Sequence, residues 1–256
     1  MRKSLLVLLL WAPFAMALIP SPDPRLDATT QKAIQAFLVH NRIFDSPKDL
    51  DNAPYIVAAD AGRVLGANGE RIYARGDLDP TQPNYGIFRR GKAYTDPDTH
   101  ELLGINADDI GTARFLRADD LTTLAVQRVT REIRPGDRLL RAEPGISLAS
   151  PTTAAPFVEG HIIDVPRGLS QAGLLDAVTL NRGRRDGLVE GQLLSVIRAG
   201  ASVRDALTGA PTSLPDVRAG TLLVFRTYEK LSYALVLSAS RSLAVMDRFE
   251  TADQAQ

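Results

Sequence analysis

Two stretches of this chain carry the same residues at a constant separation of 109 positions. The matched residues are glycines, turn-forming residues and arginines: Arg89, Gly91, Asp96, Thr99, Gly111, Thr112 and Arg117 in the first stretch, and Arg198, Gly200, Asp205, Thr208, Gly220, Thr221 and Arg226 in the second. After one added residue the match resumes, from Leu121 with Leu231 to Asp137 with Asp247. Because self-similarity at a fixed separation is the signature of a repeated supersecondary unit, the pattern predicts two tandem copies of one module.

Short apolar runs broken by turn residues fill both stretches. From Tyr55 onward, runs rich in Val, Ile, Leu and Tyr alternate with Gly, Asn, Asp or Pro, which is typical of all-β domains. Asn68-Gly69 favours the positive φ of a tight hairpin turn. The glycine before threonine, Gly111 or Gly220, either permits a β-bulge or ends a strand. We expect a mainly β chain in which each copy is a small β-barrel or β-sandwich-like module.

Composition places the boundaries between the modules. One short amphipathic helix is expected near the start, because Ile34, Phe37 and Leu38 share a face and Thr29 or Thr30 can cap it. Its expected place is across an exposed sheet or a barrel end. The expected order is a tether with this helix, a first module, a linker rich in Pro, Thr and Ala, a second module and a tail, at 18–53, 54–142, 143–156, 157–251 and 252–256.

The first residues have the pattern of a secretory signal peptide. Arg2 and Lys3 precede an apolar run, and small residues stand at Ala15 and Ala17, as a signal peptidase requires. The run is interrupted by Pro13 and is too short for a spanning helix. We expect a signal peptide at 1–17 with cleavage after about Ala17, a periplasmic location, and no membrane span after cleavage.

Charge and cysteine content restrict the functional classes. The formal net charge is +0, whereas a nucleic-acid-binding domain is usually basic, so no nucleic-acid partner is expected. The chain has no cysteine, so a hydrophobic core rather than disulfides must stabilise it. Neither Gly-x-Ser-x-Gly nor Ser-x-x-Lys occurs, and both are common settings of a serine nucleophile. The sequence therefore predicts no catalytic residues, no cofactor and no enzymatic activity.

The histidines and paired carboxylates were weighed as metal or catalytic sites. The histidines share no spacing, although a metal site needs converging ligands; they are His40, His100 and His161. We expect each to be structural or exposed, with no metal site. The acidic pairs Asp108-Asp109 and Asp119-Asp120 lack the alternating ligands of a calcium loop, so we expect them to be solvated.

One cationic stretch is the candidate binding site. Arginine forks match carboxylate and phosphate oxygens, so this stretch could contact anionic envelope polymers. The alternative is a solvated loop balanced by Asp186 and Glu190. The candidate binding residues are Arg182, Arg184, Arg185 and Arg198.

Several segments, in this order, carry a family resemblance. They are Asn52-Ala53-Pro54-Tyr55-Ile56-Val57, Asn68-Gly69-Glu70-Arg71-Ile72-Tyr73-Ala74-Arg75-Gly76, Tyr85-Gly86-Ile87-Phe88-Arg89, Pro135-Gly136-Asp137-Arg138-Leu139, Ala219-Gly220-Thr221-Leu222 and Ser232-Tyr233-Ala234-Leu235-Val236. The set resembles the long C-terminal region of bacterial LysM-containing, peptidoglycan-associated envelope proteins. The Gly-Asp-Thr-Leu motif that begins a LysM domain is absent, so the resemblance implies an envelope setting but assigns no glycan-binding residue.

These observations predict a non-enzymatic exported cell-envelope protein that binds or scaffolds peptidoglycan or an envelope protein. Two alternatives stay open. One is an enzyme that acts on envelope polysaccharide through carboxylates brought together between the two copies. The other is an accessory subunit of a secretion or surface-appendage assembly.

Overall fold

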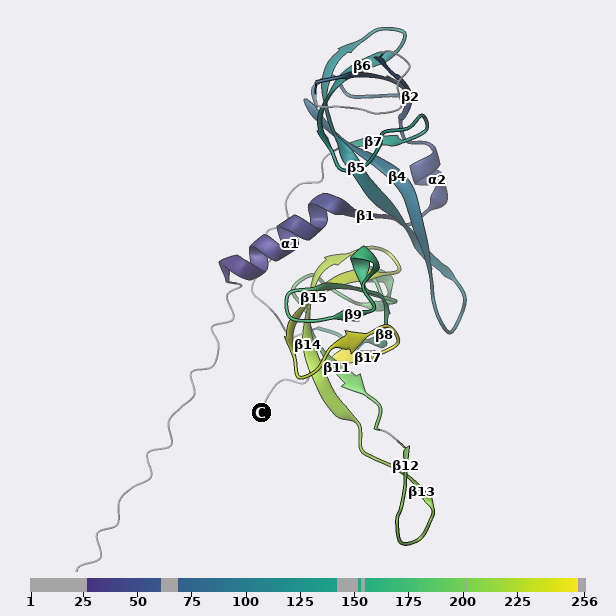
Figure 1. Cartoon of the computed structure of the whole chain (residues 1–256), viewed down its shortest axis with the longest axis vertical. Coiled ribbons are helices and arrows are strands. Elements are labelled where there is room, and N and C mark those ends of the chain that lie inside the picture. The colour runs from purple at the N-terminus through teal and green to yellow at the C-terminus, as the bar shows by residue number, and fades with distance from the viewer. Residues whose placement is uncertain (1–26, 61–68, 142–151, 153–154, 201, 253–256) are drawn as a thin grey trace, which may run out of the picture.

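The fold consists of two β-barrels arranged along the long axis of the molecule, with a helix beside their junction (Figure 1). The structure is a computed structural model that describes residues 27–60, 69–141, 152, 155–200 and 202–252. The expected signal peptide, Asn68 and most of the expected linker lie outside these residues. None of the described helices has the length and apolar character needed to span a membrane.

The first barrel is closed by one long strand that pairs on both edges. Its elements are β1 (Asn41–Phe44), α2 (Pro47–Asp51), β2 (Tyr55–Ala59), β3 (Arg71–Arg75), β4 (Asn84–Thr95), β5 (Leu102–Ala118), β6 (Thr122–Val129) and β7 (Arg138–Arg141). Strand β5 pairs with β4 along one edge, and with β1 and then β6 along the other. The ring therefore runs β4-β5-β6-β3-β2-β7, with β1 added beside β5.

The second barrel is also closed, in the order β11-β14-β15-β10-β8-β17. Its strands are β8 (Glu159–Asp164), β10 (Ala177–Leu180), β11 (Leu193–Arg198), β14 (Val217–Thr227), β15 (Ser232–Ala239) and β17 (Arg248–Thr251). Two small pairs complete it: β9 (Gln171–Ala172) with β16 (Leu243–Ala244), and β12 (Ser202–Arg204) with β13 (Pro211–Ser213). The mainly β class expected from the sequence is confirmed.

The two rings have the same strand order when their strands are taken in chain sequence. The residues matched at a separation of 109 or 110 also make matching contacts. Arg89 binds both carboxylate oxygens of Asp137, at 2.7 and 2.8 Å, and Arg198 contacts both oxygens of Asp247, at 3.2 and 3.0 Å. These likenesses agree with a repeated unit; the common origin of the two barrels stays a prediction.

The glycines before threonine lie at β-bulges. The pairing of β4 with β5 shifts register next to Gly111, and that of β11 with β14 shifts next to Gly220. An added Cβ would lie 2.2 Å from the carbonyl oxygen of Arg128 at the first position and 2.5 Å from that of Ser238 at the second. Of the two alternatives for these glycines, the bulge is therefore correct.

Each barrel has its own apolar interior, and a third cluster lies between them. Alternate residues fill the interiors, as a half-exposed strand requires; Ile72, Ala74 and Leu124 are examples in the first barrel. Strands β14 and β15 are buried on both faces instead. Their outward residues, such as Leu223 and Phe225, pack against α1 and the first barrel's β4–β5 hairpin.

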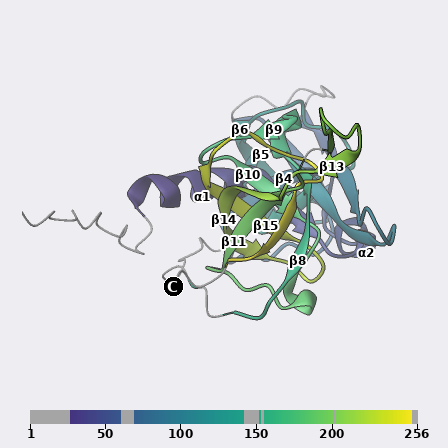
Figure 2. The same ribbon diagram turned by 90° about the horizontal axis from the view of Figure 1, so that it is seen from below.

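Helix α1 (Ala28–His40) covers the outer wall of the second barrel. Its Phe37 ring contacts Tyr233 edge-on, with the centroids 4.8 Å apart. Viewed along the long axis, the helix projects from one side of the molecule (Figure 2). The expected face is confirmed at Ile34 and Phe37, which are buried.

One of the two expected places of the helix is observed, and two other details of the expected N-terminal region were wrong. Of the two expected places, the helix takes the face of a sheet and not a barrel end, because the outer wall of the second barrel is apolar. Its N-cap is Asp27, whose carboxylate accepts a hydrogen bond from the amide of Thr30. Residues 41–51, expected within the tether and helix region, form β1 and α2.

Candidate functional site

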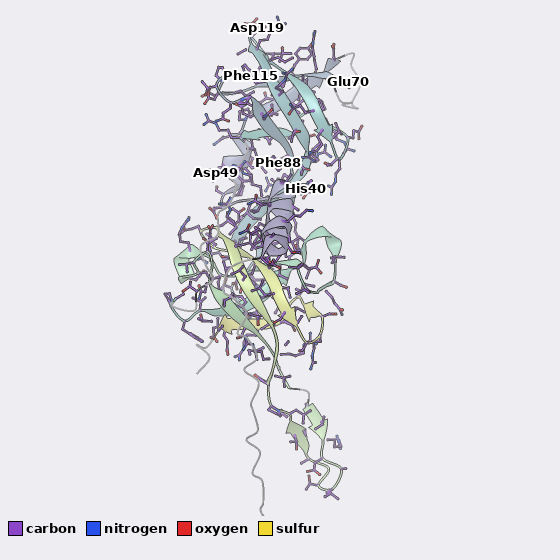
Figure 3. All side chains as sticks on the ribbon, turned by 90° about the vertical axis from the view of Figure 1, so that its left-hand side faces the viewer. His40, Asp49, Glu70, Phe88, Phe115 and Asp119 are labelled. Atoms are coloured by element: carbon purple, nitrogen blue, oxygen red, sulfur yellow. The ribbon has the colours of Figure 1, made fainter. Side chains whose placement is uncertain are left out.

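A cleft of about 970 Å³ lies between helix α1 and the two barrels. Its lining mixes apolar and polar groups, and the polar ones come from the helix, the first barrel and, at Asp164, the second barrel. Those that carry charge or hydrogen-bonding capacity are His40, Asn41, Lys92, Tyr94, Asn106, Asp108, Asp109, Thr130, Arg131 and Asp164. His40 lies at the junction of the barrels, whereas Asp119 lies at the far end of the first barrel (Figure 3).

A buried carboxylate holds one side of the cleft together. Asp109, on β5, is 8% exposed, and Arg128 binds both of its oxygens at 2.7 and 2.8 Å. His40 Nδ1 lies 2.8 Å from Asp109 Oδ2, at the end of α1. The Thr130 hydroxyl donates to the backbone carbonyl of Asp109. A buried carboxylate needs partners to offset its desolvation. Asp109 has one on the first barrel, Arg128, and one at the end of α1, His40, so it fixes the helix end against the first barrel.

The neighbouring carboxylate faces the cleft. Asp108 Oδ1 accepts a hydrogen bond from Asn106 Nδ2 at 2.7 Å, and its Oδ2 lies 3.2 Å from Arg131 Nη1. The expectation that Asp108-Asp109 is a solvated turn was wrong, because both residues lie within β5 and have cationic partners. Asp119-Asp120 does lie on an exposed turn after β5.

A third carboxylate comes from the second barrel. Asp164, at the end of β8, accepts from Lys92 Nζ at 2.5 Å and from the Tyr94 hydroxyl at 3.0 Å. Burial raises the pKa of Tyr94, and the negative charge of Asp164 raises it further. Tyr94 therefore stays a neutral phenol whose hydroxyl donates a hydrogen bond to Asp164, from one barrel to the other.

The tip of the β4–β5 hairpin is anchored in the second barrel. Asp96 Oδ2 accepts from Asn181 Nδ2 at 3.0 Å and from Arg182 Nη1 at 3.1 Å. Burial raises the pKa of Asp96, but hydrogen bonds from the Thr99 and Asp98 amides and from these two side chains outweigh it and lower the pKa to about 2. The charged form of Asp96 thus stabilises the docked hairpin.

Replacing Asp96 by asparagine tests this anchor. The lowered pKa means that its stabilisation is complete above about pH 4 and is lost as the pH falls through about 2. We expect Asp96→Asn to lower the free energy of unfolding at pH 7 by about 2 kcal/mol, as for a hydrogen bond to a charged group, and to flatten the loss of stability between pH 4 and 2. Denaturant unfolding at several pH values measures both effects.

Asp205→Asn is the matched control, because Asp205 makes the same turn on a hairpin that touches no other barrel. Its loss of stability should be much smaller. Equal losses in the two variants would show that Asp96 acts only within its own turn.

The four candidate arginines each have a carboxylate partner inside the protein. Arg182 contacts Asp96, Arg184 contacts Glu229 and Arg185 binds both oxygens of Glu101 at 2.9 and 2.6 Å; Arg198 pairs with Asp247. Arg182 and Arg185 thereby hold the first barrel's hairpin. Arg198 lies apart from them and stabilises the second barrel's own closure, so the structure does not bring the four together.

The remaining histidines lie apart from the cleft. His100 adopts φ 61° in the β4–β5 turn, and His161 Nδ1 lies 3.8 Å from Asp98 Oδ2. Within the described ranges, no group of three or more His, Asp or Glu side chains is placed to hold a metal ion.

Sequence reasoning missed the cleft because its groups come from segments far apart in the chain. His40 and Asp109 are separated by 69 positions, and Tyr94 and Asp164 by 70. One signal was available: Leu222-Leu223-Val224-Phe225 is an uninterrupted apolar run, and such runs mark strands that are buried on both faces.

The comparisons with known proteins give no family assignment. No protein-family model matches the chain, and no curated protein matches its sequence.

Proposed function

We propose that this chain is a non-enzymatic cell-envelope protein in which the two barrels act as one binding module. The cleft between α1 and the barrels is its binding site, and peptidoglycan is its ligand. The observation that carries the proposal is the cleft itself, to which the first barrel contributes cations, carboxylates and an amide and the second barrel contributes Asp164. This reading keeps the periplasmic location implied by the N-terminal pattern and the resemblance to LysM-associated proteins.

The chemistry of the cleft suits a polar polymer. Lys92 and Arg131 have side chains that are 57% and 62% exposed, so their charges can reach carboxylates of a ligand while each also contacts an aspartate. Asn106 and Asp108 offer hydrogen-bonding groups of the kind that bind hydroxyls and amides. Peptidoglycan carries hydroxyls, amides, carboxylates and amines along one chain.

The enzymatic alternative needs carboxylates brought together between the two copies, and the edge of the cleft also holds a His40–Asp109 pair. Both oxygens of Asp109 are already bound by Arg128, which suits a structural carboxylate better than one that assists a base. Of the four aspartates that a paired-carboxylate mechanism would use, Asp108 and Asp109 line the cleft. Binding therefore accounts for the geometry more fully than catalysis does.

Sedimentation with purified peptidoglycan sacculi tests the proposed function. The wild-type protein should sediment with the sacculi, and the double variant Lys92→Ala, Arg131→Ala should bind about tenfold more weakly, as expected when exposed ligand contacts that together contribute about 1.4 kcal/mol are removed. Bound and free protein in the supernatant give the affinity.

Arg117→Ala is the control. Arg117 is 70% exposed and pairs with Asp119, at the end of the first barrel away from the cleft. An equal loss in this variant would indicate general charge attraction, and no sedimentation of the wild type would leave an envelope protein as the partner.

A further inference from the structure

The two barrels carry equivalent hairpins that have different surroundings. The β4–β5 hairpin of the first barrel docks on the second barrel, and Tyr94 and Leu103 are buried there. Its counterpart, β12–β13, extends away from the second barrel at the end of the molecule (Figure 1). On this hairpin Leu207 is 97% exposed and Val203 is 40% exposed.

The tips of the two hairpins are built alike. Oδ1 of Asp96 accepts from the amides of Asp98 and Thr99, at 2.9 and 3.0 Å. Oδ1 of Asp205 accepts from those of Leu207 and Thr208, at 2.7 and 3.0 Å. In the docked hairpin the second oxygen binds Asn181 and Arg182. Among the described residues, the Asp205 carboxylate has no hydrogen bond or ion pair outside its own turn.

The receiving surface also has a counterpart. In the second barrel the docked hairpin and α1 cover a wall whose outward residues include one row across three strands, Ala177, Leu235 and Leu223. The equivalent row of the first barrel crosses β3, β6 and β5 at Arg71, Ala125 and Arg114. Arg75 follows Arg71 by four residues, as Asn181 follows Ala177 in the second barrel. Arg75 therefore stands at the place that Asn181 has in the second barrel.

This wall of the first barrel is cationic, and none of the described elements covers its arginines. Arg71, Arg75 and Arg114 are exposed, and in the described part of the chain they form no hydrogen bond or ion pair. Leu116, at the place of Phe225, is 41% exposed beside them. The surface thus offers guanidinium donors and an apolar side chain where the second barrel offers an amide, a guanidinium and an aromatic ring.

We propose that the β12–β13 hairpin of one copy docks on the β3-β6-β5 wall of a second copy, with the Asp205 carboxylate bound by Arg75. The contact repeats between chains the arrangement that joins the two barrels within one chain. It is weaker than the internal contact, because Ala210 stands where the first hairpin has Glu101 and the ion pairs of that residue have no counterpart. Because hairpin and wall are different surfaces, the contact is heterologous and extends into an open chain or closes into a ring.

Charge exchange at the proposed pair tests this inference independently of any ligand of the cleft. Sedimentation equilibrium of the purified protein should show association that grows with concentration. Asp205→Arg and Arg75→Asp should each weaken it about tenfold through like-charge repulsion, and the double variant should recover most of the affinity. Arg75 is exposed and Asp205 is half-buried in its own turn, so circular dichroism of each variant must first show that the barrels keep their fold.

Arg241→Asp is the control, since Arg241 is exposed on the second barrel and belongs to neither the hairpin nor the wall. It should leave the association unchanged. A wild-type protein that stays monomeric at about 1 mM, the weakest affinity usually counted as binding, overturns the proposal. Association that both single variants leave unchanged also overturns it, and so does a double variant that recovers none of the lost affinity.

Discussion

Phe37→Ala lowers the free energy of unfolding by about 3 kcal/mol, the low end of the usual loss for a buried phenylalanine. The Phe37 ring packs edge-on against Phe225 and Tyr233, with centroids 5.6 and 4.8 Å away. Both partner rings are fully buried, so truncation leaves a cavity between helix and barrel wall. Denaturant unfolding followed by circular dichroism measures the loss.

Val39→Ala is the control on the same helix, because Val39 is 54% exposed. Its effect should stay within about 0.5 kcal/mol, as for most surface substitutions. A loss below about 1 kcal/mol for Phe37→Ala, far under the usual cost of a phenylalanine cavity, would mean that α1 does not stabilise the second barrel.

Alanine at either bulge glycine should be nearly as damaging. In Gly111→Ala the new methyl group would lie 2.2 Å from the Arg128 carbonyl oxygen, and in Gly220→Ala 2.5 Å from that of Ser238. Both obstacles are backbone atoms of the paired strand, so relief requires the strands to separate where the barrel closes. We expect losses of about 3 kcal/mol for Gly111→Ala and about 2 kcal/mol for Gly220→Ala, the range of overpacking.

Thermal and denaturant unfolding of both variants measure these losses. Gly173→Ala provides the comparison, because the nearest atom to its Cβ would be Asp176 Oδ2 at 3.8 Å; its stability should change by at most about 0.5 kcal/mol. Full tolerance of alanine at one bulge but not the other would argue against equivalent roles for the two glycines.

Local chemistry explains what could be predicted. The Asp96 and Asp205 turns are made by a carboxylate that accepts backbone amides two and three residues ahead, and such turns depend on adjacent residues alone. The buried face of α1, with Ile34 and Phe37, follows from helical spacing in the same way.

The cleft and the docked hairpin could not be predicted in this way. Asp109 looked like half of a solvated pair, yet its partners Arg128 and His40 arrive from β6 and from α1. Tyr94 and Asp164 meet only because the hairpin of one barrel reaches the other. Contacts of this kind depend on how whole elements are placed, which no spacing along the chain encodes.

The sequence by itself determined the β class, the positions of several turns, and the matched residues of two similar stretches, because strand alternation and turn chemistry act between near neighbours. Only the tertiary structure decided which of the two equivalent hairpins is covered and which is exposed. Asp96 and Asp205 make the same turn, but Asp96 reaches Asn181 and Arg182, whereas the β12–β13 hairpin that carries Asp205 extends away from the second barrel. The physical reason is that a hairpin is buried only when another surface lies within its reach. The second barrel and α1 form such a surface beside the β4–β5 hairpin, whereas the β12–β13 hairpin points away from both barrels.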